Sequence, residues 1–212
     1  MFQGIPAMMV SGGVTGSAAF AWTQRASDNF DAGAPGADLT TSGNWSITQG
    51  TMLYHAGGNV VQQSAASDNF YYWNAYSFLS TQYSQGTMVI GSGATVCGYA
   101  VRIQPVAVTA YFAMYDGTNV KLVRYNAGSG VTVVQIAKAY VGGEKLRIEA
   151  IGAGSATRLT VYEDIGSGFV AIGTMTSVDP GGTYIDNGSP GLFGFNGREG
   201  FYLDDWSGGD GA

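Results

Sequence analysis

The sequence is short of the residues that usually mark disulfide, zinc or triad chemistry. Its 212 residues include a single cysteine, Cys97, so no disulfide can form within the chain. They also include a single histidine, His55, which excludes a site of several histidines and leaves one candidate for any Ser-His-Asp arrangement. Cys97 stands in an apolar, strand-like segment, which favours a buried and inert thiol.

Charge and long apolar runs are also scarce. Charged residues make up 11% of the chain, with only nine Lys and Arg and a net charge of −6. Recognition of phosphates needs clustered basic residues, so we expect no nucleic-acid partner and no anionic membrane surface. No run approaches 18 consecutive apolar residues, so we expect no transmembrane helix.

The N-terminal segment lacks basic residues as well. Met1 to Ala21 contains no Lys or Arg and is interrupted by glycines, which makes it a poor signal peptide. We expect residues 1–26 to form an arm that docks on a neighbouring subunit. Its anchors would be Met8, Met9, Phe20 and Trp22. This interpretation favours assembly in a host cytoplasm, with an extracellular location as the alternative.

What the chain has in abundance is glycine, aromatic residues and alternation. Lys145 to Glu163 alternates apolar and polar residues on both sides of a Gly-rich break, as two half-buried antiparallel strands do. We expect Leu146, Ile148 and Ala150 to share a face with Leu159 and Val161. Pairing Ile148 with Leu159 would place Glu149 opposite Arg158 on the outer face.

Similar segments follow one another along the chain. About a dozen strand candidates are separated by turn signals, of which Asp116-Gly117 is a strong one, and no amphipathic helix is evident. We therefore predict an all-β, two-sheet antiparallel jelly-roll sandwich over residues 27–212.

Several segments together resemble the concanavalin A-like lectin/glucanase superfamily, in particular its laminin-G-like and pentraxin-type jelly rolls. The segments that carry the resemblance are Ser27-Asp-Asn-Phe, Trp45-Ser-Ile, Gly98-Tyr-Ala-Val-Arg-Ile, Val120-Lys-Leu-Val-Arg-Tyr, Lys145-Leu-Arg-Ile-Glu-Ala, Leu159-Thr-Val-Tyr-Glu, Gly191-Leu-Phe-Gly-Phe and Phe201-Tyr-Leu-Asp-Asp-Trp. The resemblance implies two stacked sheets with the first and last strands near each other. It also implies a concave outer face where members bind glycans, some with calcium, while other members cleave polysaccharides.

Catalytic residues are not apparent. The glucanases of the resembled superfamily that retain anomeric configuration carry a Glu-x-Asp-x-x-Glu motif on one strand, and this sequence lacks that motif. Glu149 and Glu163 could form the pair of carboxylates that a glycosidase needs. The expected register, however, pairs Glu149 with Arg158 and places Glu163 at the end of its strand. His55 precedes a turn and is expected to be a bystander. We expect no catalytic residue and no enzymatic activity.

Two candidate ligand sites follow. Calcium prefers oxygen ligands, and Asp28, Asp31, Asp204 and Asp205 would converge if the first and last strands are neighbours. The alternative is that these carboxylates cap turns and that no cofactor binds. Sugars stack on exposed aromatic rings, for which the candidates are Tyr71, Tyr72, Trp73, Tyr76 and Trp206. The alternative is that these rings fill the core.

The interpretation favoured by the arm, the low charge and the compact fold is a non-enzymatic structural subunit. It would be displayed on a phage virion as a head decoration or tail protein. Its partners would be copies of itself or other virion subunits, and a cell-surface glycan is a further possibility. The alternative is a carbohydrate-binding module or lectin, and a polysaccharide hydrolase or lyase ranks third.

Overall fold

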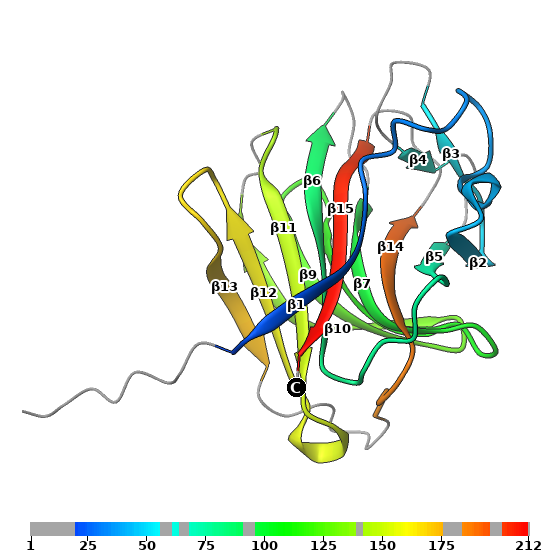
Figure 1. The fold of residues 1–212 in the computed structure, drawn as a ribbon. Coiled ribbons are helices and arrows are strands. Elements are labelled where there is room, and N and C mark those ends of the chain that lie inside the picture. Colours follow the sequence, from blue (N-terminus) through cyan, green and yellow to red (C-terminus); the bar gives the residue numbers. More distant parts are fainter. Residues whose placement is uncertain are drawn as a thin grey trace, which may run out of the picture.

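The structure is a computed structural model of the chain, and it describes residues 20–55, 61–63, 68–90, 96–138, 142–175, 184–195 and 201–211. It is an antiparallel two-sheet sandwich, as predicted (Figure 1). Short 3-10 turns at η1 (Leu39–Ser42) and η2 (Gly154–Ala156) supply the helical content of the described residues. No helix in those ranges is long and apolar enough to cross a membrane.

Each sheet mixes strands that are distant in sequence. Sheet A has the order β13 (Val170–Met175), β12 (Arg158–Asp164), β11 (Lys145–Ile151), β6 (Gln82–Ile90), β15 (Phe201–Gly211), β4 (Val61–Gln63) and β3 (Met52–Tyr54), and β1 (Trp22–Asp28) also pairs with β15. Sheet B has the order β10 (Ser129–Ala137), β9 (Asn119–Asn126), β8 (Thr109–Tyr115), β7 (Val96–Gln104), β14 (Ser189–Phe195), β5 (Asn69–Trp73) and β2 (Trp45–Gln49).

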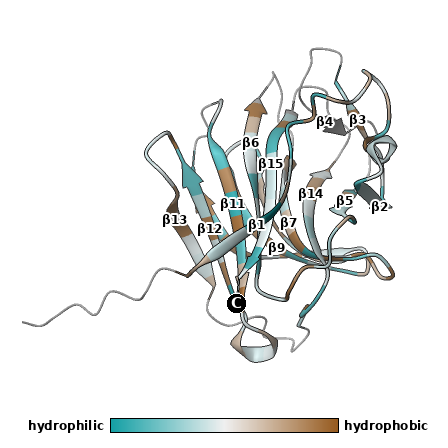
Figure 2. Cartoon of the chain, viewed as in Figure 1, coloured by the Kyte–Doolittle hydropathy of each residue, from teal (hydrophilic) through white to brown (hydrophobic). Residues whose placement is uncertain are grey.

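The β11–β12 hairpin keeps the predicted face but not the predicted register. Hydrophobic and hydrophilic segments alternate along β11 (Figure 2), and Ile148, Leu159 and Val161 all lie in the core. Ile148, however, pairs with Val161 and not with Leu159. The expected pairing was two residues out of step, so Glu149 lies opposite Thr160 and not opposite Arg158.

The core between the sheets contains tryptophans from both of them. Trp45 and Trp73 come from sheet B and Trp206 from sheet A, and all three are at most 8% exposed. Trp45 meets Trp73 and Trp206 edge-on, at ring-centroid distances of 5.3 and 4.6 Å. Large rings of this kind account for much of the apolar surface that folding removes from water.

A buried arginine closes one end of the core. Arg102 is fully buried and adopts a left-handed backbone with φ of 57°. Its guanidinium donates to the carbonyls of Ser80, Ile185 and Gly152 and to the hydroxyl of Thr157. These contacts offset the cost of burying a charge, and burial lowers the pKa of Arg102 from its usual value.

The first and last strands are neighbours, as the resemblance implied. β1 runs antiparallel to β15 (Figure 1), and Asp28 lies opposite Trp206. Close approach needs the glycines of β15, because a Cβ on Gly209 would lie 2.2 Å from the Thr23 carbonyl oxygen. The predicted arm boundary at residue 26 therefore moves, since Trp22 to Ala26 belong to a strand of the sandwich. Met8 and Met9 lie outside the described residues.

Candidate functional site

A cleft of about 850 Å³ opens where β1 and β15 meet the segment that carries η1. Its polar lining is Gln24, Ser27, Asp28, Asn29, Thr41, Ser42, Asn44, Asp205 and Ser207. Its apolar lining is Ala32, Gly33, Ala34, Ala37, Tyr54, Trp73 and Trp206. Hydroxyl, amide and carboxylate groups thus surround a smaller apolar wall, and no Lys or Arg among the described residues lines the cleft.

One wall is the turn that follows β1. The Asp28 carboxylate accepts a hydrogen bond from the Phe30 amide at 2.8 Å and from the Trp45 indole nitrogen at 2.8 Å. These bonds hold Phe30 in a left-handed conformation, with φ of 56°, and bury its ring beneath the turn. Asn29 and Asp31 hydrogen-bond to each other on the exposed side. Asp28 therefore shapes the wall by tying the turn to the core.

The segment with η1 forms a second wall. Asp38 caps η1 by accepting the Thr40 amide, and its other oxygen accepts the Tyr71 hydroxyl at 2.8 Å. The Tyr71 oxygen in turn accepts the Met52 amide at 3.0 Å. This chain of bonds fixes a segment that has little regular structure of its own, so the wall is preorganised. Asn44, which ends the segment, is exposed, and its side chain donates no hydrogen bond to the described residues.

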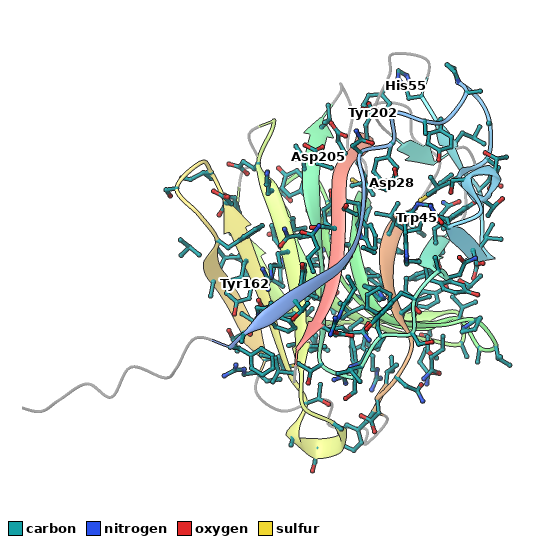
Figure 3. All side chains as sticks on the ribbon, viewed as in Figure 1. Asp28, Trp45, His55, Tyr162, Tyr202 and Asp205 are labelled. Carbon is teal, nitrogen blue, oxygen red and sulfur yellow. The ribbon has the colours of Figure 1, made fainter. Side chains whose placement is uncertain are left out.

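A β-bulge in β15 forms the third wall. Asp204 pairs with Thr87 and Ser207 with Gln85, so two residues of β15 lie opposite the single Gly86. The extra residue, Asp205, has φ of 48°, a conformation that Asp and Asn adopt more readily than most side chains. Its side chain is exposed at the cleft, and Figure 3 shows Asp28 and Asp205 near the same end of β15.

The aromatic floor offers edges and not faces. Trp73 stacks on Trp206 with centroids 5.2 Å apart, and the two rings are 8% and 1% exposed. The Trp206 indole donates to the buried Ser84 hydroxyl at 2.9 Å. Tyr54 is 4% exposed, and Gly33 lies so close to its ring that a Cβ there would come within 2.2 Å. A ligand in the cleft would touch ring edges from below and polar groups from the sides.

The predicted aromatic set is divided between the core, the opposite face of sheet B and the surface. Tyr71 and Trp206 belong to the core because their polar atoms are bound within it. Tyr72 lies on the face of sheet B away from sheet A, packed against the cluster of Phe70 and Phe193. Tyr76 is 39% exposed and lies under Arg25, outside the cleft. Trp73 and Trp206 alone contribute to the cleft.

The structure brings two of the four predicted aspartates to the cleft, and Asp31 and Asp204 do not line it. Asp28 and Asp205 both line the cleft. Burial raises the pKa of Asp204, and the nearby charges of Asp205 and Asp31 act in the same direction. Among the described residues, no group of three or more His, Cys, Asp or Glu side chains is arranged to hold a metal ion. Calcium binding therefore stays a prediction.

The glutamates and the histidine lie elsewhere. Burial raises the pKa of Glu149, while Arg147 and the Tyr162 hydroxyl oppose that shift. Glu163 forms an ion pair with Lys138. His55 packs on Tyr202 with ring centroids 4.3 Å apart. None of the three lines the cleft.

Sequence reasoning missed Asn44, Tyr54 and the bulge at Asp205. Asn44 and Tyr54 come together only through the pairing of distant strands, and no local pattern marks them. The bulge has one weak local signal, because Asp204-Asp205 interrupts the alternation of the last strand. An interrupted alternation is compatible with a bulge, and Asp readily adopts the left-handed backbone of the extra residue.

The fold is shared with solved lectins and glycosidases. The winged bean acidic lectin, complexed with methyl-α-D-galactose, matches with a TM-score of 0.57 and 10% identity, over 88% of this chain and 98% of that chain. Lectin II from Ulex europaeus matches with a TM-score of 0.54 and 12% identity, over 90% and 100%. A xylan β-1,4-xylosidase from Bacillus halodurans matches with a TM-score of 0.55 and 10% identity, over 87% of this chain and 39% of that chain.

These similarities establish a concanavalin A-like jelly roll, and at such identities they show the fold alone. The chain spans about two fifths of the length of the xylosidase. No protein-family model matches the sequence, and no curated protein matches it. None of the three matched proteins is described as a virion component, so the assembly interpretation gains no support from them.

Proposed function

We propose that this chain is a non-catalytic carbohydrate-binding domain and that its glycan lies in the cleft between β1, the η1 segment and the β15 bulge. The observation that carries the proposal is the lining of the cleft. Hydroxyl, amide and carboxylate groups converge around aromatic ring edges in a space of about 850 Å³. A sugar offers the complement, because its hydroxyls need many hydrogen-bond partners while its C–H faces pack on apolar walls.

The charge of the lining favours neutral sugars. Asp28 and Asp205 are the acidic residues in the described lining, which includes no basic side chain. An acidic sugar would bring a carboxylate towards two others without a counterion, which is unfavourable. The exposed carboxylate of Asp205 is well suited to accept hydrogen bonds from sugar hydroxyls, because an ionised carboxylate is an acceptor only.

The proposal that the domain is non-catalytic rests on the structural role of Asp28. A glycosidase needs two carboxylates free to act on the scissile bond. The two oxygens of Asp28 hold the Phe30 amide and the Trp45 indole, so this carboxylate has a structural task. The fold is common to lectins and glycosidases and supports sugar recognition in either case.

The experiment is a glycan-array screen with the folded chain, run once with calcium and once with EDTA. We expect binding to a subset of neutral glycans and none to their sialylated or uronic-acid counterparts. Asp205→Asn should keep the bulge, because Asn tolerates the backbone conformation of residue 205. The variant should also show a smaller difference in affinity between neutral and acidic glycans. Loss of binding in EDTA would show that the site also includes a bound cation. Binding to acidic glycans alone would contradict the proposal.

A further inference from the structure

A second cavity, of about 430 Å³, lies on the face of sheet B that points away from sheet A. Side chains of β8, β9 and β14 form its walls, among them Phe112, Met114, Val123, Tyr125 and Phe193. They alternate with core residues along each strand, so they occupy the opposite face from the sandwich core. The cavity shares no lining residue with the glycan cleft and is of the size of small-ligand sites.

The floor of this cavity is a stack of aromatic rings. Phe112 and Phe193 lie 3.7 Å apart at their centroids, with an angle of 16° between their planes. Phe70 packs beside both and is fully buried, and Phe112 and Phe193 are themselves 2% exposed, so their edges and not their faces meet the cavity. Phe195, 38% exposed, stands at the rim. The rings are held by their neighbours before any ligand arrives, which lowers the entropic cost of binding.

The charged groups around the cavity are already engaged. Lys121 lies 2.6 Å from the Asp116 carboxylate, which also accepts the amides of Thr118 and Asn119. Burial raises the pKa of Asp116, but these bonds outweigh that effect and hold the pKa below its usual value. The Tyr125 hydroxyl donates to Asp68. An ionic ligand would therefore compete with contacts that these groups already make.

We propose that this cavity binds a small, uncharged, apolar molecule of one or two rings, which would lie against the edges of Phe112 and Phe193 and against the exposed ring of Phe195. A sugar fits poorly, because much of the wall consists of Phe, Met and Val side chains and the Asp68 and Asp116 carboxylates there already accept hydrogen bonds. The proposal is independent of the glycan cleft, so either site can fail in experiment while the other stands.

The test uses the neutral fluorophore N-phenyl-1-naphthylamine and the variant Gly130→Leu. Gly130 lines the cavity on β10, and a Cβ there would meet Val123 and Tyr125 at ordinary contact distances of 3.4 and 3.6 Å. The backbone of Gly130 is not left-handed, so a side chain can replace hydrogen and fill the cavity without strain. Gly142→Leu is the matched control, because Gly142 faces open space.

We expect a saturable, one-site rise in fluorescence with the wild-type chain and with Gly142→Leu. Gly130→Leu should weaken binding at least about tenfold. The anionic probe 8-anilino-1-naphthalenesulfonate, of similar ring size, should also bind at least about tenfold more weakly than the neutral probe. If Gly130→Leu does not fold, Phe195→Ala at the rim provides the second variant and should weaken binding several-fold. Absence of saturable binding, equal binding of both probes, or no effect of a folded cavity variant would overturn the proposal.

Discussion

Trp73 and Trp206 stack across the sandwich with centroids 5.2 Å and planes 22° apart, although they lie on different sheets and 133 positions apart in the chain. Both line the proposed glycan cleft and both belong to the core. The floor of the cleft is therefore part of the structure that holds the two sheets together. Variants of these rings test folding before they test binding.

We expect Trp73→Ala to lower the free energy of unfolding by about 3–5 kcal/mol, because it removes a large buried side chain and leaves a cavity. Trp73→Phe should cost less, since a ring is kept. Urea denaturation followed by circular dichroism measures both. An Ala variant as stable as the wild type would contradict the packing described here.

Replacement of Arg102, even by lysine, should lower the stability of the fold. Lysine keeps the charge but cannot donate to four separate acceptors, so Arg102→Lys should cost about 3 kcal/mol. For a chain of this size, that loss corresponds to a fall in unfolding midpoint of roughly 6–12 °C. The exposed Arg158→Lys is the control and should leave the midpoint unchanged. Equal midpoints for the two variants would show that the buried contacts contribute little.

The first strand should be needed for stability. Arg25 lies 2.7 Å from Asp210, whose side chain is fully buried, and Phe20 packs on Gly211. A chain of residues 27–212 would leave that carboxylate without its partner and expose an edge of β15. We expect a lower unfolding midpoint and more aggregation than for residues 20–212, as measured by scanning calorimetry and light scattering. Equal behaviour would mean that β1 adds nothing to the sandwich.

Glu149 should weaken the fold as the pH rises. Its pKa in the folded chain is raised, chiefly by burial, so its contribution is fully present below the unfolded pKa of about 4.3 and is lost as the pH rises through the folded value. Glu149→Gln should therefore gain stability relative to wild type between pH 4 and pH 7. Asp164→Asn should move the other way, because backbone amides of Gly166 and Gly168 lower the pKa of Asp164, so its contribution to stability is present above the unfolded pKa of about 3.9 and is lost as the pH falls below it. Chemical denaturation between about pH 2 and pH 7 covers the transitions of both side chains.

Cys97 should not react with thiol reagents in the folded chain. It is buried, as predicted from its apolar context, and burial raises its pKa, so little thiolate is available. We expect no reaction with a chromogenic disulfide reagent under native conditions and one thiol per chain in denaturant. Rapid reaction of the folded chain would contradict this.

The sequence predicted the fold through alternation, and its errors have physical causes. Alternation with a period of two determines which side chains share a face, but a shift of the partner strand by two residues leaves that pattern unchanged. The predicted β11–β12 register was wrong by such a shift. The sequence pattern predicts a strand only over the second half of β6, from Thr87, because two buried positions in its first half are polar. Gln82 bonds the backbone of Arg102, and Ser84 bonds Trp206. Such partners are invisible in a local pattern.

The site was predicted less well than the fold. Aspartates near both chain ends were expected to meet, and Asp28 and Asp205 do so because β1 pairs with β15. The aromatic residues of β5 alternate between the two faces of sheet B, and which face is the core depends on the opposite sheet. Asn44 is a loop residue whose position in the cleft depends on tertiary bonds such as that between Tyr71 and Asp38.

Calorimetric titration of the best neutral glycan from the array is the most direct test of the glycan cleft. The wild-type chain and Asn74→Ala, an exposed asparagine outside the cleft, should bind alike. Asn44→Ala should bind about tenfold more weakly, equivalent to about 1.4 kcal/mol, because it removes an exposed hydrogen-bonding group that lines the cleft. Unchanged affinity in Asn44→Ala would place the sugar elsewhere, and the absence of any measurable binding by the folded chain would contradict the account.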